Sequence, residues 1–322
     1  MIAAFFRSNQ PAVLAALPVV VAALFAPAFW HAPAPGAALM PLAALAHHML
    51  GSSGWAHALL GAALIAAVAV QLTVLCNALD LIDRRNHLVA VTLPVALAGL
   101  GSTAHDPALL GLPFLLMGMR RAWSVSNNGP ALAMLFDAGL LLGVAALCYL
   151  PYAFVLVALW ASTSLIRPFA WREYIMPVFA VALAFYLAWL VLHLLGHGPW
   201  RPMLTLMGPD GDPAVLWQGA ARKAFLILLV AALIVALAAF NRSHARSVMR
   251  GKNLRSAFMA FALALCVITG LLALLKGAFP AVLVAVPAAV LLAYPLVDPK
   301  RAWVAEAALI GLFALALWVR WS

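Results

Sequence analysis

Long runs of apolar residues follow one another along the whole chain, separated by short stretches that hold most of the charged residues. Within the runs there is none of the strict apolar–polar alternation that marks a half-buried strand. Several runs approach the roughly 20 residues that an apolar helix needs to cross a bilayer. The pattern therefore predicts an all-α, polytopic transmembrane protein with about 11 transmembrane (TM) helices.

Turns rich in glycine, proline or charge separate the predicted crossings. The first run is longer than the about 7–15 apolar residues of a signal-peptide core, so we interpret it as a retained helix. The crossings cover residues 11–29, 56–79, 87–100, 108–119, two runs within 131–166 joined at Tyr149-Leu150-Pro151-Tyr152, and 174–195, 224–240, 256–275, 280–296 and 302–318.

Two longer polar segments, residues 30–55 and 196–222, interrupt this series after the first and the seventh crossing. The first begins with the proline-broken HAPAPG and ends with GSSGW, and between them MPLAALAHHML is long enough for a short helix. A helix of that length cannot span a bilayer, so we expect it to lie along the membrane surface.

Composition agrees with lipid as the main solvent. Hydrophobic residues make up 67% of the 322 residues, charged residues 9%, and the mean hydropathy is +1.08. Soluble domains average about 45–50% apolar and about 25% charged residues. The net charge of +10 does not indicate nucleic-acid binding, because the basic residues sit in short loops and no RNA-binding or zinc-finger spacing is present.

The distribution of basic residues predicts the orientation. If the N-terminus is cytoplasmic and the crossings alternate, all but five of the 19 Lys and Arg residues fall on the cytoplasmic side. Cytoplasmic loops of membrane proteins carry such an excess. Both long polar segments then lie on the outer face. The five outer basic residues are Arg201, Arg222, Lys223, Lys276 and Arg320.

Asp137 is a carboxylate inside an apolar run, where a charge is costly and is usually paired or functional. We expect an intramembrane ion pair with Arg121 or Arg172, with Arg120 as another possible partner and a proton relay as the alternative role. Gly139 and Gly143 follow as a GxxxG pair, which favours close approach of a second helix. Glu306 near the start of the last crossing has Lys300 or Arg301 as candidate partners.

The most basic loop covers residues 241–255 and contains five positive and no negative charges. We expect it to lie against anionic lipid headgroups, where each charge contributes about 1 kcal/mol. A cytoplasmic protein partner is the alternative occupant of the same patch.

Candidate chemistry on the outer face centres on His105 and Asp106. Either residue could act as a general base near neutral pH. The alternative is that Asp106, which precedes Pro107, only caps the next helix. No metal or cofactor is predicted, because the outer histidines show no ligand spacing and the three cysteines form no CxxC pair. These histidines are His31, His47, His48, His57, His193 and His197.

Two resemblances to known families add to this interpretation. The FFRSN head, the LxxRRNHL and RRAW turns, FDAG and RPFAWREY together resemble a bacterial inner-membrane family without a known activity, over roughly the first 200 residues. The layout of long outer segments after helices one and seven resembles the GT-C class of membrane glycosyltransferases. That resemblance implies a single membrane domain, with a GT-C-like module over 1–222 and further helices over 223–322.

The GT-C resemblance implies a sugar donor linked to polyprenyl phosphate, used at the outer face of the bacterial inner membrane. The outer cations Arg201, Arg222 and Lys223 would hold its phosphate, and the alternative is that they only anchor helix ends at the headgroups. One departure stands out: residues 30–55, where GT-C enzymes keep an acidic residue, contain no Asp or Glu.

Three functions therefore stay open. The first is a GT-C-like glycosyltransferase, and the second is a non-enzymatic membrane scaffold or assembly factor without the catalytic acid. The third is a transporter, which would need broken helices and a polar path at mid-membrane. Few polar residues lie within the predicted crossings, so the transporter ranks last.

Overall fold

A computed structural model describes residues 2–8, 10–30, 40–51, 53–104, 106–125, 131–166, 169–196, 218–277, 279–299 and 302–321. Within these ranges the chain forms thirteen α-helices, three 3-10 segments and no strand, so the protein is all-helical. The elements are α1 (Ile2–Phe6), η1 (Pro11–Ala16), α2 (Leu17–Phe25), η2 (Ala26–Phe29), α3 (Pro41–Leu50), α4 (Gly54–Ala78), α5 (Leu88–Gly99), α6 (Pro107–Trp123), α7 (Leu132–Cys148), η3 (Leu150–Val155), α8 (Leu156–Ile166), α9 (Trp171–Leu194), α10 (Ala220–Arg246), α11 (Met249–Lys276), α12 (Ala281–Val297) and α13 (Ala302–Trp321).

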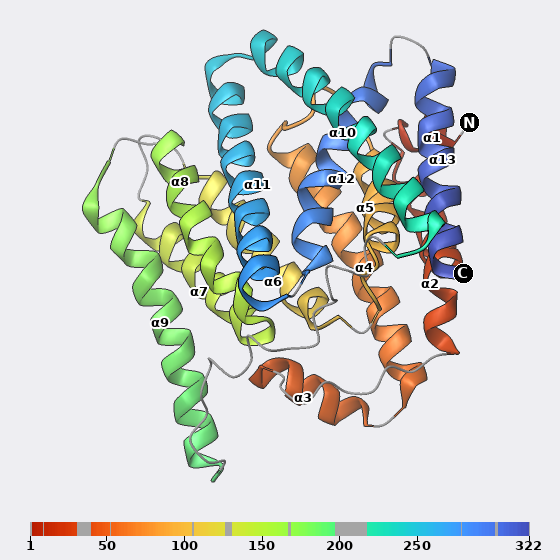
Figure 1. Ribbon diagram of the computed structural model, residues 1–322. Helices are drawn as coiled ribbons and strands as arrows, with labels where there is room; N and C mark the ends of the chain where they lie inside the picture. The colour runs from red at the N-terminus through yellow and green to blue at the C-terminus, as the bar shows by residue number, and fades with distance from the viewer. Residues whose placement is uncertain are drawn as a thin grey trace.

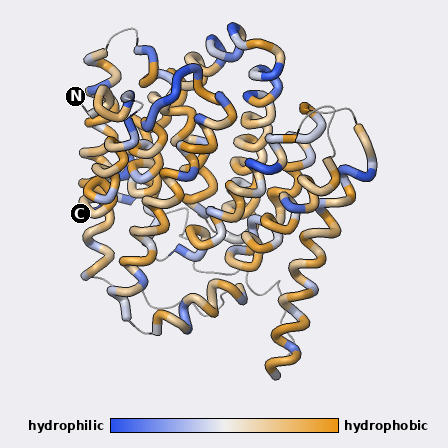
Figure 2. Tube along the Cα trace, turned by 180° about the vertical axis from the view of Figure 1, so that it is seen from behind, coloured by the Kyte–Doolittle hydropathy of each residue, from blue (hydrophilic) through white to orange (hydrophobic). Residues whose placement is uncertain are grey.

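Most helices run roughly along one direction, vertical in Figure 1, and α3 lies across the lower end of the assembly. Figure 2 shows hydrophobic residues along the lengths of the helices and the most hydrophilic stretches toward the end opposite α3. Six segments of the described chain are long and apolar enough to cross a membrane. They are Pro11–Phe29, Gly54–Ala78, Trp171–Leu194, Ala220–Arg246, Met249–Leu275 and Ala302–Trp321. The length and apolar composition of these six segments indicate an integral membrane protein.

The shorter helices α5 and α12 form the centre of the structure. Every residue of α5 is buried, as is nearly every residue of α12, and the two helices pack on each other. A helix that is apolar all round needs apolar surroundings, and for α5 and α12 neighbouring helices supply them. Between the two helices, the Thr92 hydroxyl donates to the Ala289 carbonyl at 2.8 Å.

Helices α7 and α9 pack closely through the GxxxG pair, as the sequence predicts. A Cβ atom added to Gly139 would lie 2.6 Å from the backbone of Pro177, and one added to Gly143 would lie 2.6 Å from the Ala184 Cβ. Small residues at such positions let helix backbones approach. The rest of α9 is mostly exposed, and its lower end extends away from the other helices (Figure 1).

The predicted turn at Tyr149-Leu150-Pro151-Tyr152 also has a clear counterpart. α7 ends at Cys148, and η3 leads into α8. The buried Tyr152 hydroxyl donates to the Ala108 carbonyl in the first turn of α6 at 2.8 Å. This bond ties the turn to the start of α6, where Asp106 and Pro107 lie.

One predicted loop is wrong. Residues 241–255 are not a loop but the end of α10 and the start of α11, separated only at Ser247 and Val248. The basic residues of this stretch are good helix formers, so charge there does not end the helices.

The first apolar segment, Pro11–Phe29, also differs from a regular helix. Prolines 11, 18 and 27 occupy the first turns of η1, α2 and η2 and break the segment into three pieces.

Candidate functional site beneath helix α3

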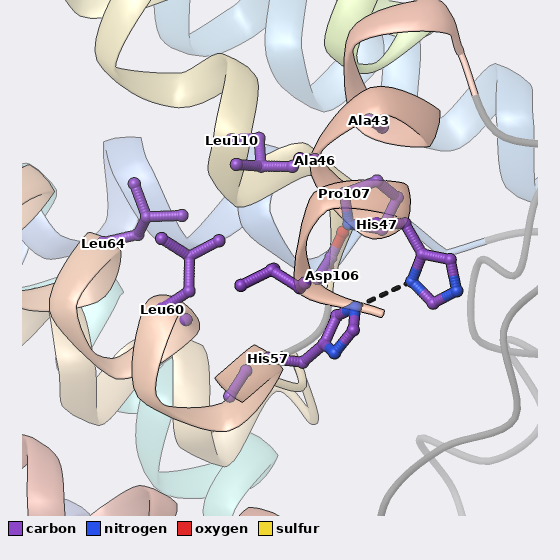
Figure 3. Close-up of a pocket in the computed structure, with 12 residues that line it drawn as sticks. Ala43, Ala46, His47, His57, Leu60, Leu64, Asp106, Pro107 and Leu110 are labelled. Carbon is purple, nitrogen blue, oxygen red and sulfur yellow. Dashed lines mark hydrogen bonds between the residues drawn. The ribbon is translucent and has the colours of Figure 1, made fainter. Parts of the chain in front are cut away.

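A small pocket of about 60 Å³ lies where α3 crosses the beginnings of α4 and α6. Figure 3 shows leucine side chains on one side of it and two imidazole rings with Asp106 on the other. The lining residues are mostly apolar, with three titratable side chains among them. The full lining is Ala43, Ala46, His47, Leu50, His57, Leu60, Gly61, Leu64, Ala104, Asp106, Pro107 and Leu110.

A tight connection folds α3 back toward α4. α3 ends at Leu50 and is followed by Gly51, whose positive φ of 63° glycine adopts at little cost. α4 begins after Ser53, whose hydroxyl accepts from the Ala56 N–H at 3.4 Å and caps the helix. Because the connection is this short, the last turn of α3 lies beside the first turn of α4.

Close backbone approach also narrows the space between α4 and the turn before α6. A Cβ atom added to Gly61 would lie 1.8 Å from the Ala104 carbonyl oxygen, so only glycine allows this contact. It brings the α4 side of the pocket against the turn that carries Asp106.

His47 and His57 form a hydrogen-bonded pair at the mouth of this pocket. Nε2 of His57 lies 2.7 Å from Nδ1 of His47, and Nδ1 of His57 lies 2.8 Å from the Ser53 carbonyl oxygen (Figure 3). A carbonyl can only accept, so Nδ1 of His57 carries a hydrogen. In the neutral pair Nε2 of His57 then accepts from Nδ1–H of His47, which leaves a lone pair on Nε2 of His47. One further proton turns the pair into a cation.

Asp106 caps helix α6. Its carboxylate accepts from the Ala108 N–H at 2.9 Å and from the Ser102 hydroxyl at 3.4 Å. The capping role that the sequence allows for an Asp before Pro is therefore present. The same carboxylate belongs to the wall of the pocket, and its predicted companion His105 lies outside the described residues.

No family model, no curated protein and no solved structure matches this chain.

Of the three predicted phosphate-binding cations, the two that the structure describes do not line this pocket. Arg201 falls outside the described residues, while Arg222 and Lys223 occupy the first turn of α10 and do not line the pocket. Lys223 is exposed and Arg222 is half-buried, near Arg320 at the end of α13.

Asp137, Arg121 and Arg172 are all exposed on their helices. Neither of the two ion pairs found in the described part of the chain includes Asp137. The intramembrane ion pair therefore stays a prediction. The Glu306 carboxylate accepts from the Ala3 N–H in α1 at 3.2 Å. Lys300 and Arg301 lie outside the described residues.

A second polar cluster, at the end opposite α3, is not predicted by the sequence. The Arg255 side chain is only 4% exposed, donates to Asp83 at 2.7 Å and to the Leu81 and Ser243 carbonyls at 2.9 and 2.7 Å. The Ser243 hydroxyl also donates to Asp83, and the Tyr294 hydroxyl donates to the Leu81 carbonyl at 2.6 Å. We call these residues the Arg255 cluster. It joins the α4–α5 connection to α10, α11 and α12.

Burial of Arg255 changes the interpretation of the basic stretch 241–255. Arg242, Arg246 and Arg250 are exposed and Lys252 is half-buried, so four of its five positive charges remain near the surface. Arg255 instead forms the centre of a network within the protein. The sequence does show both partners of this network: a carboxylate in the charged turn after α4, and a basic stretch later in the chain. It does not show that the two come together.

The three cysteines are free thiols, with Cys76 and Cys148 buried and Cys266 exposed. No group of three or more metal-ligating side chains occurs in the described part of the chain. Among the described outer histidines, His47 and His57 lie within hydrogen-bond distance of each other, whereas His31, His105 and His197 lie outside the described residues.

Proposed function

We propose that the chain is a glycosyltransferase of the bacterial inner membrane, with a GT-C-like layout of about 11 crossings and a cytoplasmic N-terminus. It would use a sugar linked to polyprenyl phosphate, at the pocket beneath α3 on the outer face. The observation that carries this proposal is the His47–His57 pair in one pocket wall with the Asp106 carboxylate. An imidazole that shares a proton with a second imidazole is suited to general base catalysis near neutral pH.

In the proposed reaction an acceptor hydroxyl attacks the anomeric carbon of the donor sugar. The carbon–oxygen bond to phosphate breaks, and polyprenyl phosphate leaves with the electron pair. The acceptor proton passes to the lone pair on Nε2 of His47, while His57 and the Ser53 carbonyl orient the ring and stabilise the added charge. Asp106, and His105 beside it, stay candidates for a second acid or base at the same pocket.

The donor phosphate needs fixed positive charge, for which Arg201, Arg222 and Lys223 remain the proposed residues. The phosphate-linked donor is already activated, so the reaction requires no organic cofactor. A pocket of about 60 Å³ is smaller than the about 300–1,000 Å³ of typical ligand sites. Helix α3 would have to lift for the donor to enter, and α3 buries only Ala43 of its ten residues.

The test measures sugar transfer in membranes supplied with a panel of radiolabelled polyprenyl-phosphate sugars. Replacing His47 by Gln removes the lone pair on Nε2 and is expected to lower the turnover rate about 10²–10⁴-fold. The matched control is His48→Gln, since His48 is the next residue of α3 but does not line the pocket. Equal activity of both variants, in an enzyme shown to be active, would exclude His47 as the base.

A specific observation also favours the non-enzymatic alternative. The Asp106 carboxylate already serves as a helix cap, and the pocket as it stands has no room for a sugar. A membrane scaffold or assembly factor would keep this pocket closed. Under that alternative no sugar of the panel is transferred, and Asp106→Asn leaves the amount of a stably co-purifying partner unchanged.

A further inference from the structure

Little buried surface holds α3 in place over the pocket. Of its ten residues only Ala43 is buried, while Leu45 and Met49 are 54% and 79% exposed. A helix that buries so little apolar surface gains little free energy from packing. A side-chain hydrogen bond that joins α3 to a neighbouring helix therefore contributes a larger share of what keeps the pocket closed.

The His47–His57 pair supplies such a bond between α3 and α4. Nδ1 of His47 lies 2.7 Å from Nε2 of His57, and the two ring centroids are 4.6 Å apart. A bond between two imidazoles needs one nitrogen that carries a hydrogen and one that does not. Because Nδ1 of His57 already donates to the Ser53 carbonyl, Nε2 of His57 is the nitrogen that accepts.

The number of added protons decides whether this bond can form. A first proton binds to the lone pair on Nε2 of His47, and the bond between the rings remains and gains strength from the charge. A second proton has only Nε2 of His57 left to bind. Both facing nitrogens are then donors, and two positive charges lie side by side, so the bond is lost and the rings repel each other.

The charged and titratable groups around the pair can offset one positive charge. Asp106 at the start of α6 lines the same pocket and supplies one negative charge. His48, the next residue of α3, is exposed. α7, on which α3 also packs, ends at the thiol of Cys148, and its carboxylate Asp137 lies about three turns before that end. On α4 the next titratable group is Cys76, about five turns from the pair.

We propose that the His47–His57 pair is a proton-operated latch, which holds α3 over the pocket with no or one added proton and releases it with two. Imidazole is the side chain that ordinarily changes charge between pH 5 and 8, so α3 lifts as the pH falls through this range. The latch regulates entry to the pocket and rests on the proposed function for its purpose. Its opening is measured without sugar transfer, so the latch and the transferase activity can fail separately.

The experiment measures how fast a maleimide reacts with a cysteine beneath α3 in the full chain, purified in neutral detergent. The reporter is Ala43→Cys, and a second protein carries Met49→Cys at an exposed position of the same helix. Cys148 and Cys266 are replaced by alanine in both. The ratio of the two rates corrects for the pH dependence of thiol reactivity itself. With both histidines present, this ratio is expected to rise at least about fivefold from pH 7.5 to pH 5.

His57→Gln removes the second protonation step, because glutamine does not take up a proton in this range. The ratio should then stay constant within about twofold, whether α3 rests open or closed. His48→Gln is the matched control, since it removes a neighbouring histidine of α3 that does not line the pocket, and it should keep the full rise. A constant ratio with both histidines present, the same rise in His57→Gln, or an equal loss of the rise in His48→Gln would overturn the latch.

Further variants and a second thiol guard against misfolding. Leu110→Cys, on the α6 side of the pocket, replaces the reporter if Ala43→Cys does not fold, and His47→Gln replaces His57→Gln in the same way. The same contrast is expected, and a rise with and without the intact pair would contradict the latch. Buried Cys76 stays in every protein and should remain unreactive at pH 5. A rise at Cys76 as large as at the reporter would show unfolding in place of latch release, and would also contradict it.

Discussion

At the scale of single residues, the most consequential finding is a buried arginine that is fully committed to internal partners. Arg255 donates to a carboxylate and to two backbone carbonyls that come from different parts of the chain. A buried charge is tolerated only when such partners replace its hydration. Asp83 supplies the only negative charge among these partners, so the cluster depends on that one carboxylate.

Asp83→Asn tests this dependence. The amide keeps the shape but not the charge, so we expect the free energy of unfolding to fall by about 1–3 kcal/mol, as for loss of a charged partner of a buried group. The matched control is Asp298→Asn, because the Asp298–Arg84 pair at 3.9 Å is highly exposed and should contribute little. Thermal unfolding of the detergent-solubilised variants measures both changes. Equal effects of the two substitutions would contradict a special role for Asp83.

The same carboxylate predicts a response to acid. Partial burial alone would raise the pKa of Asp83, but hydrogen bonds from Ser243 and Arg255 and the nearby positive charges outweigh it and lower the pKa below 3.8. A lowered pKa in the folded state means that this contribution is fully present above pH 3.8 and is lost as pH falls toward the folded pKa. Wild type should therefore lose stability below about pH 4 more steeply than Asp83→Asn. Parallel unfolding profiles of the two proteins between pH 3 and 6 would rule out this contribution.

At the scale of elements, the close packing of α7 on α9 gives the sharpest prediction. Gly139→Ala places a Cβ 2.6 Å from the Pro177 backbone, which cannot move aside as a flexible side chain does. We expect a loss of about 1–3 kcal/mol from overpacking. Gly270→Ala in α11 is the control, since its added Cβ meets nothing within 4 Å, and it should be neutral or stabilising by about 0.5–1 kcal/mol. The melting temperature should fall for Gly139→Ala and stay the same or rise for Gly270→Ala, and an equal fall in both variants would contradict this packing.

The elements also show what hydrophobic patterning can and cannot reveal. Runs of apolar residues located most helices well, including the short helix α3, and the turn at Tyr149–Tyr152 was also predicted. Helix ends were less predictable, because a charged residue does not mark the end of a helix. Arg120 and Arg246 were assigned to loops but lie in the last turns of α6 and α10. The pairing of His47 with His57 depends on how tightly Gly51 and Ser53 fold α3 against α4, and residue spacing does not encode that geometry.

At the scale of the whole molecule, orientation in the membrane decides which end can meet which substrate. The distribution of basic residues assigns the pocket beneath α3 to the outer face and the Arg255 cluster to the cytoplasmic face. The long segments satisfy the length that a bilayer requires, and buried α5 and α12 are short because protein rather than lipid surrounds them. A count of membrane-spanning helices that is based on length alone therefore leaves such central helices out.

Cysteine labelling in intact cells tests this arrangement. With the three native cysteines replaced by serine or alanine, single cysteines at Met49 and Leu195 report on one end, and at Ser124 and Arg250 on the other; all four positions are exposed. A membrane-impermeant maleimide should reach Met49→Cys and Leu195→Cys in intact cells, and Ser124→Cys and Arg250→Cys only after permeabilisation. The assignment follows from the excess of basic residues on the second pair's side.

The result bears directly on the transferase proposal, because an impermeant reagent and an outer-face acceptor sugar share the same compartment. If Met49→Cys reacts only after permeabilisation, the His47–His57 pair faces the cytosol and cannot act on an acceptor at the outer face. Labelling of Met49 and Arg250 from the same side would instead contradict the alternation of crossings itself, and with it the assignment of both polar ends.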